Sequence, residues 1–240
     1  MTKICLDAGH YGKYNQSAIV PAYYESEMNW KLHLLLKKEL EEYGFAVSVT
    51  RDKFETDVEL TKRGQMAKEC DLLLSIHSNG AERADADHVV VFCPVSDTRT
   101  DIDEKSLALA KELAPVITEV MGVTEKNYRI AQVKSEYDRD GDGVKNDNYY
   151  GILHGARSVN VPCMILEHSF HTNERTAKWL LSEENLKKLA QAEAKPLADF
   201  YGMKKRIWRV QVGAYTQKEN AEKMRQRLLA AGYDAIIKQD

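Results

Sequence analysis

The chain contains few cysteines, and their spacing argues against a cysteine-bound metal. Cys5, Cys70, Cys93 and Cys163 are the only four among 240 residues, and no two of them form a C-x-x-C pair. Cys5 and Cys163 lie inside apolar runs. We therefore expect buried, reduced thiols rather than zinc ligands.

The chain also lacks a long apolar segment and an excess of charge of one sign. No run of about 18 apolar residues occurs, so the sequence predicts no transmembrane helix and no membrane insertion. The formal net charge is −3 at pH 7, and this near balance does not indicate a nucleic-acid partner or a general affinity for anionic membranes. No signal peptide precedes the first apolar run, so we expect a protein made in the cytoplasm without a classical export signal.

Short apolar runs alternate with amphipathic runs over most of the chain. This alternation is typical of a layered α/β domain whose mostly parallel sheet is flanked by helices. The length accommodates one such domain and a small appendage. The expected strands are 3–7, 46–50, 71–76, 88–92, 129–133 and 163–166, and the expected helices are 25–43, 60–69, 104–121, 176–181 and 185–201.

A second, smaller unit follows the first domain. Residues 208–212 alternate like a strand, and 233–237 form a second apolar run. Between them, Thr216 and Glu219 form a capping box that begins a helix. The pattern predicts one β-α-β unit, without a second copy of it in the 240 residues. The expected boundaries are 1–202 for the first domain, 203–206 for a short basic linker and 207–240 for the small unit.

Two histidines stand at the carboxyl ends of expected strands. His10 follows the first strand and His77 follows the strand at 71–76, and in a parallel sheet these ends share the edge where ligands collect. Glu25 opens the helix that follows the first strand. Two imidazoles and one carboxylate are a common catalytic zinc set that leaves a fourth position open for water. The sequence therefore predicts a Zn²⁺ site made of His10, Glu25 and His77.

Helix phase favours Glu25 over the neighbouring Glu27 as the third ligand. Glu25 lies three residues before Met28 and so continues the apolar stripe that faces the sheet. Glu27 points elsewhere and is expected to form a solvated pair with Lys31. A buried acid needs a partner, for which a metal is suitable. On its own, Glu25 is equally explained as an acidic residue at a helix N-terminus. The stripe consists of Met28, Leu32, Leu35, Leu36 and Leu40.

Glu167 is the candidate catalytic acid and base. It directly follows the expected strand at 163–166, where burial would raise its pKa. A hydrolase that activates water on zinc needs a group that takes the water proton and returns it to the leaving amine. Taken alone, Glu167 is an ordinary acid at a strand end, and only its combination with the three ligands favours catalysis.

These segments together resemble the zinc-dependent N-acetylmuramoyl-L-alanine amidases of the amidase-3 type. The resemblance covers nearly all of residues 2–202 and rests on four motifs in order, namely 7–10, 25–29, 75–79 and 162–173. It implies that zinc is held by His10, Glu25 and His77, with Glu167 as catalytic residue. It also implies cleavage of the amide between N-acetylmuramic acid and L-alanine in bacterial peptidoglycan.

Two further features of the first domain bear on this resemblance. Arg51 and Arg63 match arginine positions of the family that we take as structural. His168 and Ser169 depart from it, since the family commonly has a small residue and then glycine before Phe170. The departure concerns the loop beside Glu167, where His168 either touches substrate or, as we favour, covers the wall of the site.

The small unit at 207–240 resembles the first half of a SPOR domain, a peptidoglycan-binding module, through residues 208–215. In a split β-α-β fold the two strands of one half leave a gap that a strand of the other half fills. A lone half exposes unpaired strand edges, which invite pairing with another chain. We therefore expect a homodimer through residues 207–240, in which each copy inserts its residues 208–212 into the gap of the other.

The remaining signals are weak. Residues 138–143 copy the start of an EF-hand calcium loop, but Tyr149 replaces the bidentate glutamate at the twelfth position, which favours a polar turn-rich loop. His33, His88, His154 and His171 have no ligand-like spacing. His33 is expected at the surface or its boundary.

The sequence thus predicts a zinc amidase that cuts peptidoglycan, acting as an endolysin or autolysin after release by phage or mother-cell lysis. Glu167 would deprotonate water and then protonate the L-alanine nitrogen. Two alternatives stay open at this point. One is a non-catalytic wall-binding protein with a vestigial metal site, and the other is a zinc peptidase that cuts the stem peptides.

Overall fold

The first unit of the chain is built around one six-stranded sheet. A computed structural model describes residues 1–95, 100–139, 141, 143–145, 147–206 and 210–239. Neighbouring strands of the sheet are parallel except β4 and β6, which are antiparallel, so the expected mostly parallel sheet is confirmed. The strands, in sheet order, are β2 (Ala46–Val49), β1 (Lys3–Ala8), β3 (Leu72–Asn79), β6 (Cys163–Phe170), β4 (Val90–Cys93) and β5 (Arg129–Gln132).

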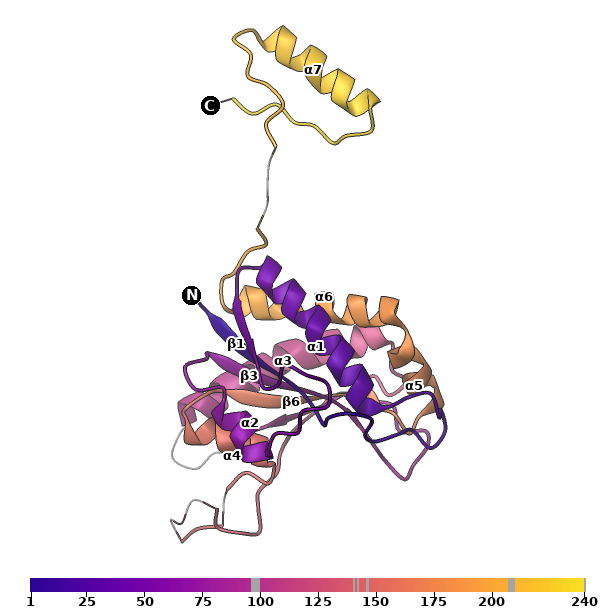
Figure 1. Cartoon of the computed structure of the whole chain (residues 1–240), viewed down its shortest axis with the longest axis vertical. Coiled ribbons are helices and arrows are strands. Elements are labelled where there is room, and N and C mark those ends of the chain that lie inside the picture. Colours follow the sequence, from indigo (N-terminus) through magenta and orange to yellow (C-terminus); the bar gives the residue numbers. More distant parts are fainter. Residues whose placement is uncertain (96–99, 140, 142, 146, 207–209, 240) are drawn as a thin grey trace. The chain divides into compact units, whose positions relative to one another are not determined.

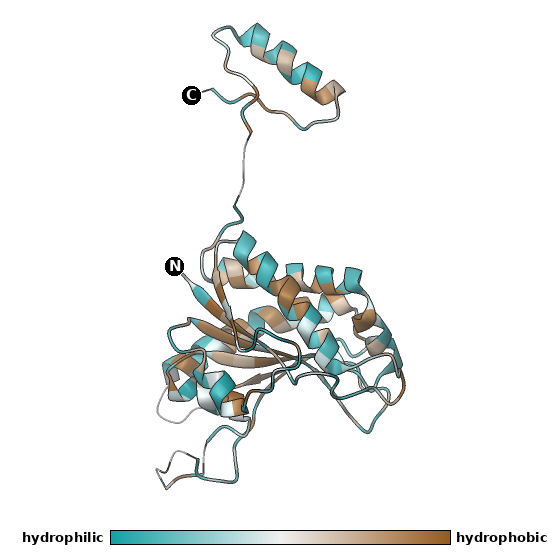
Figure 2. Ribbon diagram, viewed as in Figure 1, coloured by the Kyte–Doolittle hydropathy of each residue, from teal (hydrophilic) through white to brown (hydrophobic). Residues whose placement is uncertain are grey.

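Helices cover both faces of the sheet (Figure 1). Because successive side chains of a strand point to opposite faces, Ile4 and Leu6 pack into the larger core, whereas Cys5 packs into the smaller one. Figure 2 shows apolar strands between helices whose outer faces are polar. The larger core lies under α1 (Glu25–Glu42), α3 (Thr100–Met121), α5 (Glu174–Leu181) and α6 (Glu183–Phe200), and the smaller core lies on the side of α2 (Leu60–Gln65) and α4 (Gly151–Ser158).

Helix α4 was not among the expected helices, and its glycines explain why. A Cβ atom added to Gly155 would lie 2.0 Å from the carbonyl oxygen of Thr61, so only glycine allows α2 to approach α4 this closely. Glycine has a low helix propensity, and the short segment therefore gives a weak helical signal. Two strands are also longer than expected, since β3 continues to Asn79 and β6 to Phe170.

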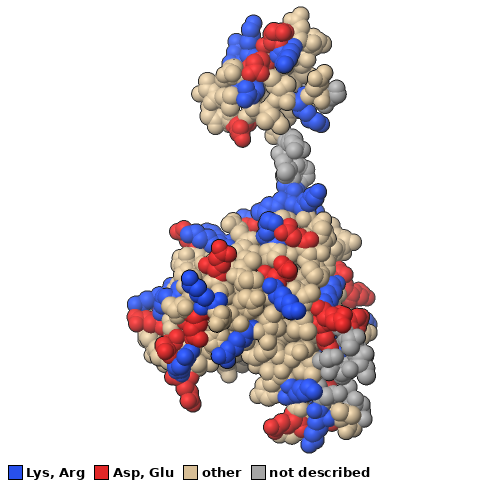
Figure 3. All heavy atoms as spheres, turned by 180° about the vertical axis from the view of Figure 1, so that it is seen from behind, with Lys and Arg blue, Asp and Glu red and all other residues tan. Residues whose placement is uncertain are grey.

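All four cysteines are buried and free, as expected. Among the described residues, no helix is long and apolar enough to cross a membrane. On the face drawn in Figure 3, basic and acidic side chains of the described residues are interspersed.

His33 is buried on α1, so the prediction of a position at the surface or its boundary was wrong. Its ring packs 4.4 Å from the ring of Trp30, which shields it from solvent on the helix. Burial lowers the pKa of His33 to about 4, because the charged imidazolium cannot be solvated there.

This burial predicts a pH-dependent contribution of His33 to stability. The folded-state pKa lies below the unfolded value, so the unfolded chain binds the extra proton and stability is lost as pH falls from about 6.5 toward 4. We expect the difference in unfolding free energy between wild type and His33→Gln to shrink by about 2 kcal/mol from pH 7 to pH 5. Urea unfolding at the two pH values measures this change, and a constant difference would contradict it.

The chain divides into two units, Met1–Lys205 and Arg206–Asp240, and the described residues of the second form one helix, α7 (Lys218–Ala230). Residues 210–212 and 233–237 are not strands, which corrects both expected strands as far as they are described. Trp208 and Arg209 lie outside the described residues. The expected capping box at Thr216 is also wrong, since Gln217 precedes the helix without a side-chain cap. An isolated strand pair is marginal in water, and the described part of this unit offers no third strand to pair with.

Candidate active site

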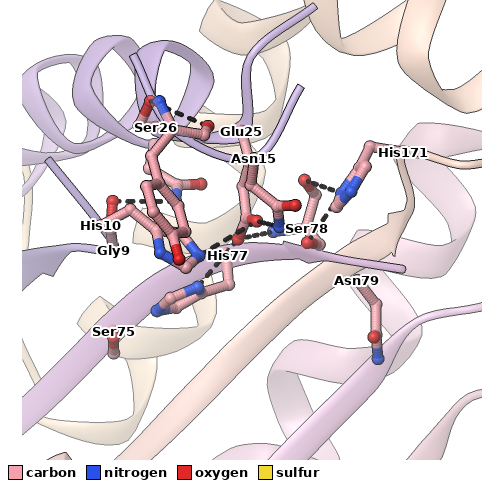
Figure 4. Close-up of polar contacts among 12 residues, drawn as sticks. Gly9, His10, Asn15, Glu25, Ser26, Ser75, His77, Ser78, Asn79 and His171 are labelled. Atoms are coloured by element: carbon pink, nitrogen blue, oxygen red, sulfur yellow. Dashed lines mark hydrogen bonds and ion pairs between the residues drawn. The ribbon is translucent and has the colours of Figure 1, made fainter. Parts of the chain in front are cut away.

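The three residues expected to bind metal come together at the carboxyl ends of the neighbouring strands β1 and β3. His10 follows β1, Glu25 begins α1, and His77 lies inside β3. One Glu25 oxygen, Oε2, lies 3.1 Å from His10 Nε2, and the other, Oε1, lies 2.8 Å from His77 Nδ1. Figure 4 shows these side chains converging. We call His10, Glu25 and His77 the triad.

The triad fits a zinc ion in donor type and spacing. Ligand atoms of a tetrahedral zinc site, with bonds near 2.0–2.1 Å, lie about 3.3 Å apart. The three donor atoms of the triad all lie within 4.8 Å of one another. Burial acts to raise the pKa of Glu25, but His10 and His77 outweigh it and hold this pKa well below its usual value. Glu25 is therefore a buried carboxylate that its two imidazole neighbours keep charged.

Glycine at position 9 allows His77 to take its place in the triad. A Cβ atom added to Gly9 would lie 2.2 Å from Cε1 of the His77 ring, closer than any real contact. The next residue, His10, has a φ of 60°, a left-handed conformation that costs energy for a residue with a side chain. The turn after β1 is thus shaped around the two imidazoles.

Gly9→Ala should therefore disrupt the metal site while the sheet remains folded. The added methyl group must displace the His77 ring, because the backbone of β1 is held on both sides by parallel partners. We expect the variant to bind zinc about 10- to 100-fold more weakly than the wild type and to lose activity accordingly. Metal analysis of the purified protein checks this, with Gly80→Ala as the comparison, because a Cβ atom added there meets no atom closer than 3.6 Å. Full zinc occupancy in Gly9→Ala would contradict the account.

Two supporting groups of Glu25 were missed by sequence reasoning. Asn15 donates its side-chain N–H to Glu25 Oε2 at 2.5 Å, and the backbone N–H of Ser78 donates to Oε1 at 3.1 Å. Ser78 in turn contacts Tyr23 and His171 through its hydroxyl group (Figure 4 shows Ser78 and His171). Asn15 also has a positive φ of 58°, which asparagine tolerates well, but such a turn residue gives no sign of its partner.

Glu27 stays outside the triad, as helix phase predicted. Its side chain is partly exposed and lies 3.7 Å from the ammonium of Lys13. The predicted partner Lys31 is therefore replaced by Lys13, which the loop before α1 brings to the same place.

Glu167 lies beside His77, because the two residues are direct partners in the pairing of β3 with β6. It sits inside β6 rather than at its end, which corrects the expected strand boundary. Its Oε2 is buried and has no hydrogen-bond partner among the described residues. Burial, with a contribution from the charge of Glu25, raises the pKa of Glu167 to about 8. This carboxyl group can therefore exchange a proton near neutral pH.

Comparison with known proteins identifies the family of the chain. The model of the Amidase_3 family, described as N-acetylmuramoyl-L-alanine amidase, matches residues 4–199, and the model of the SPOR domain matches residues 204–240. The chain belongs to the Amidase_3 family. The amidase resemblance drawn from the four motifs and the SPOR resemblance drawn from residues 208–215 are both confirmed, and membership supports amidase activity on peptidoglycan.

Relatives of this amidase agree in sequence and fold. The chain is 26% identical over 247 residues to the N-acetylmuramoyl-L-alanine amidase CwlM of Bacillus licheniformis, an alignment that covers 99% of this chain and 85% of that protein. The catalytic domain of CwlV from Bacillus (Paenibacillus) polymyxa var. colistinus has a TM-score of 0.63 at 20% identity, covering 85% of this chain and 100% of that one. The CwlD amidase of Clostridioides difficile, solved with the GerS lipoprotein, has a TM-score of 0.64 at 20% identity, covering 84% and 99%. At these identities the two structures show a shared fold.

His168 departs from the amidase pattern and lies fully buried beneath the site. Its Nδ1 lies 2.8 Å from the carbonyl oxygen of His77, and its Nε2 lies 2.8 Å from Glu193 Oε1 on α6. Burial acts to lower the pKa of His168, but the Glu193 carboxylate outweighs it and raises this pKa. His168 therefore supports the wall of the site, as favoured from the sequence, and ties β3 to α6.

Ser169 replaces a glycine of the family at a position that favours glycine, since its φ is 59°. Its hydroxyl group donates to Asp87 Oδ1 at 2.8 Å. Asp87 also accepts two hydrogen bonds from the Arg175 guanidinium and one from the Thr176 hydroxyl. Burial acts to raise the pKa of Asp87, but Arg175 and the other donors lower it to about 2. This charged network compensates the strained backbone next to Glu167, and sequence reasoning did not find it.

Arg51 and Arg63 are buried and structural, as expected. Arg51 donates from Nε to the carbonyl oxygen of Ala8 at 3.1 Å. Arg63 Nη1 lies 3.5 Å from Asp7 Oδ1. Both therefore hold the carboxyl end of β1, from which His10 projects.

The loop with the partial EF-hand pattern is described only in part. Asp140 and Asp142 lie outside the described residues. The Asp138 carboxylate accepts hydrogen bonds from the backbone N–H groups of Gly141 and Gly143, which is typical of a polar turn.

Proposed function

We propose that this chain is a zinc-dependent hydrolase of the amide bond between N-acetylmuramic acid and L-alanine in peptidoglycan. The observation that carries the proposal is the triad, with its buried Glu25, next to Glu167, whose buried Oε2 has no hydrogen-bond partner among the described residues. When bound, zinc supplies Lewis-acid chemistry, which polarises a carbonyl group and makes water easier to deprotonate near neutral pH. Either an endolysin or an autolysin would use this chemistry.

The residues of the site divide the remaining work among them. His10, Glu25 and His77 would hold the ion, and Asn15 keeps Glu25 oriented toward the histidines. Glu167 takes a proton from the attacking water and returns it to the L-alanine nitrogen as the carbon–nitrogen bond breaks. A pKa of about 8 suits both transfers, since neither protonation state is strongly disfavoured at neutral pH.

Removal and return of the metal test this proposal. A chelator should abolish the release of dye from labelled purified cell walls, and zinc added in slight excess should restore it. Magnesium added at the same concentration is the comparison, because it prefers oxygen ligands over imidazole. Undiminished dye release from fully metal-free protein would contradict zinc dependence, and no release under any condition would favour a non-catalytic wall-binding protein.

For the C-terminal unit we propose that a second copy of the chain covers its apolar surface. Helix α7, which is described throughout, has no buried residue. Two exposed residues flank it, with Val210 at 89% and Ile236 at 78% exposure. Apolar side chains left in solvent on so small a unit favour a self-complementary contact between two copies. The other large exposed apolar residues in the described part of the unit are Val212, Tyr215, Leu229, Tyr233 and Ile237.

Light scattering on the full chain at micromolar concentration should therefore give the mass of a dimer. Val210→Asp combined with Ile236→Asp should restore the monomer, because two buried, unpaired charges strongly disfavour a contact. Leu34→Asp, at an exposed apolar position of α1, is the control and should leave the dimer intact. A monomeric wild type would contradict this proposal.

A further inference from the structure

Two exposed tyrosines stand directly beside the triad. The ring of Tyr14 stacks on the ring of His10, with centroids 4.8 Å apart and planes inclined by 22°. The ring of Tyr11 stacks on Tyr14 at 6.3 Å, again at 22°. Tyr11 is 39% exposed and Tyr14 is 52% exposed. An aromatic surface therefore extends outward from a metal-binding histidine, and the proposed reaction does not use it.

The segment that carries these rings is fixed to the start of α1. The backbone N–H of Tyr14 donates to the Ser26 hydroxyl at 2.8 Å, and this hydroxyl donates to the carbonyl oxygen of Gly12 at 2.6 Å. The backbone N–H of Glu25 donates to the carbonyl oxygen of Asn15 at 3.1 Å. Ser26 itself is fully buried. The tyrosines are thus held in a fixed place relative to Glu25, which reduces the entropy lost when a ligand binds.

The chemistry of the substrate determines which of its groups can lie against the two tyrosine rings. The scissile carbonyl belongs to the lactyl group of N-acetylmuramic acid, so a pyranose ring lies only a few atoms away from the reacting carbon. The faces of a pyranose are lined with C–H groups, and a phenol ring offers a flat apolar face with a polar hydroxyl at its edge. The two exposed side chains of this surface, Tyr11 and Tyr14, carry no charge at neutral pH, so the surface is better suited to a sugar than to the carboxylates of a stem peptide.

We propose that Tyr11 and Tyr14 form a saccharide-stacking subsite that binds a sugar ring of the glycan strand next to the scissile amide. This inference rests on the proposed amidase function and adds to it a recognition element for the glycan. Tyr11 directly follows His10 in the chain, and its ring stacks on Tyr14, whereas the ring of Tyr14 stacks on His10. Tyr11 therefore serves binding rather than metal retention.

Competition kinetics on the full chain test the subsite. The substrate is a soluble disaccharide-peptide, and the two inhibitors are glycan oligosaccharides without stems and free stem peptides. Tyr11→Ala should raise the Ki of the stem-free glycan by about 2- to 10-fold, leave the Ki of the stem peptide unchanged and retain zinc. Tyr14→Phe keeps the ring and should bind the glycan nearly as wild type does. Tyr128→Ala, at an equally exposed tyrosine next to β5, is the matched control and should change neither Ki.

Three results would overturn the subsite. They are a wild type that stem-free glycan does not inhibit, a Tyr11→Ala variant that the glycan inhibits as strongly as wild type, and an equal rise of both Ki values. A wild type that releases no peptide from the disaccharide-peptide is a different result, because it contradicts the amidase function and removes the basis of the subsite.

Discussion

Glu167→Gln should lose about 10²–10⁴-fold of the amidase activity while it retains zinc and fold. The substitution keeps the shape of the side chain and removes only its ability to take and return a proton. Because Glu167 Oε2 has no partner among the described residues, no other interaction of that oxygen is lost with the charge. Turnover of a disaccharide-peptide, together with zinc content and circular dichroism, measures the three properties separately.

Glu27→Gln is the matched control for this variant. It makes the same chemical change two residues from Glu25, but at a partly exposed side chain that lies 3.7 Å from the Lys13 ammonium. Such exposed pairs contribute little, so this variant should turn over substrate as wild type does. Near-normal activity in Glu167→Gln, or a large loss in Glu27→Gln, would show that the wrong carboxylate has been assigned.

His10→Ala and His77→Ala should each lose bound zinc and, with it, nearly all activity. Each removes one of three protein ligands and leaves the buried Glu25 carboxylate with a single imidazole partner. Truncating one member of a buried charged cluster also destabilises the fold, because the remaining charge is poorly compensated. Zinc content by atomic emission, measured on variants whose fold has been checked, determines the ligand role.

His154→Ala controls for the removal of an imidazole from the same domain. The side chains of His154 and His77 are equally exposed, at 19%, but His154 faces Asp147 and is not part of the triad. This variant should retain its zinc. Unchanged zinc content in both His10→Ala and His77→Ala would refute the ligand assignment.

The triad could be predicted from sequence because each of its residues follows from a local pattern. The apolar runs before His10 and His77 predict two parallel strands whose carboxyl ends meet. In the structure, both histidines lie at the carboxyl ends of the neighbouring strands β1 and β3. Glu25 was separated from Glu27 by the period of α1 alone, and the difference in their burial agrees. Short-range periodicity, combined with the fold class, is therefore enough to predict that residues far apart in the chain lie close together in the structure.

The groups that support the triad could not be predicted, because they depend on long-range contacts of polar residues. Asn15 reaches Glu25 across a loop, and the buried pair of His168 and Glu193 joins a strand to a helix 25 residues later. No spacing rule links such positions. The burial of His33 was missed for a related reason, since its neighbours in sequence are polar and apolar alike and only the packing on Trp30 shows which face it takes.

The prediction of two C-terminal strands was wrong for a different physical reason. Alternation of apolar residues indicates which segments can pair, but a strand forms only when another strand satisfies its backbone groups. Residues 210–212 and 233–237 have the apolar pattern of strands. Among the described residues of a single chain, however, they form no ladder of hydrogen bonds with another strand. A second copy would supply one under the proposed dimer.

Mass spectrometry of the peptides released from purified peptidoglycan tests the central proposal most directly. The zinc-loaded protein should release intact stem peptides that begin with a free L-alanine amine, and the chelated protein should release none. Peptides whose new amino termini belong to residues other than that L-alanine would contradict the amidase assignment and favour a zinc peptidase acting on the stems.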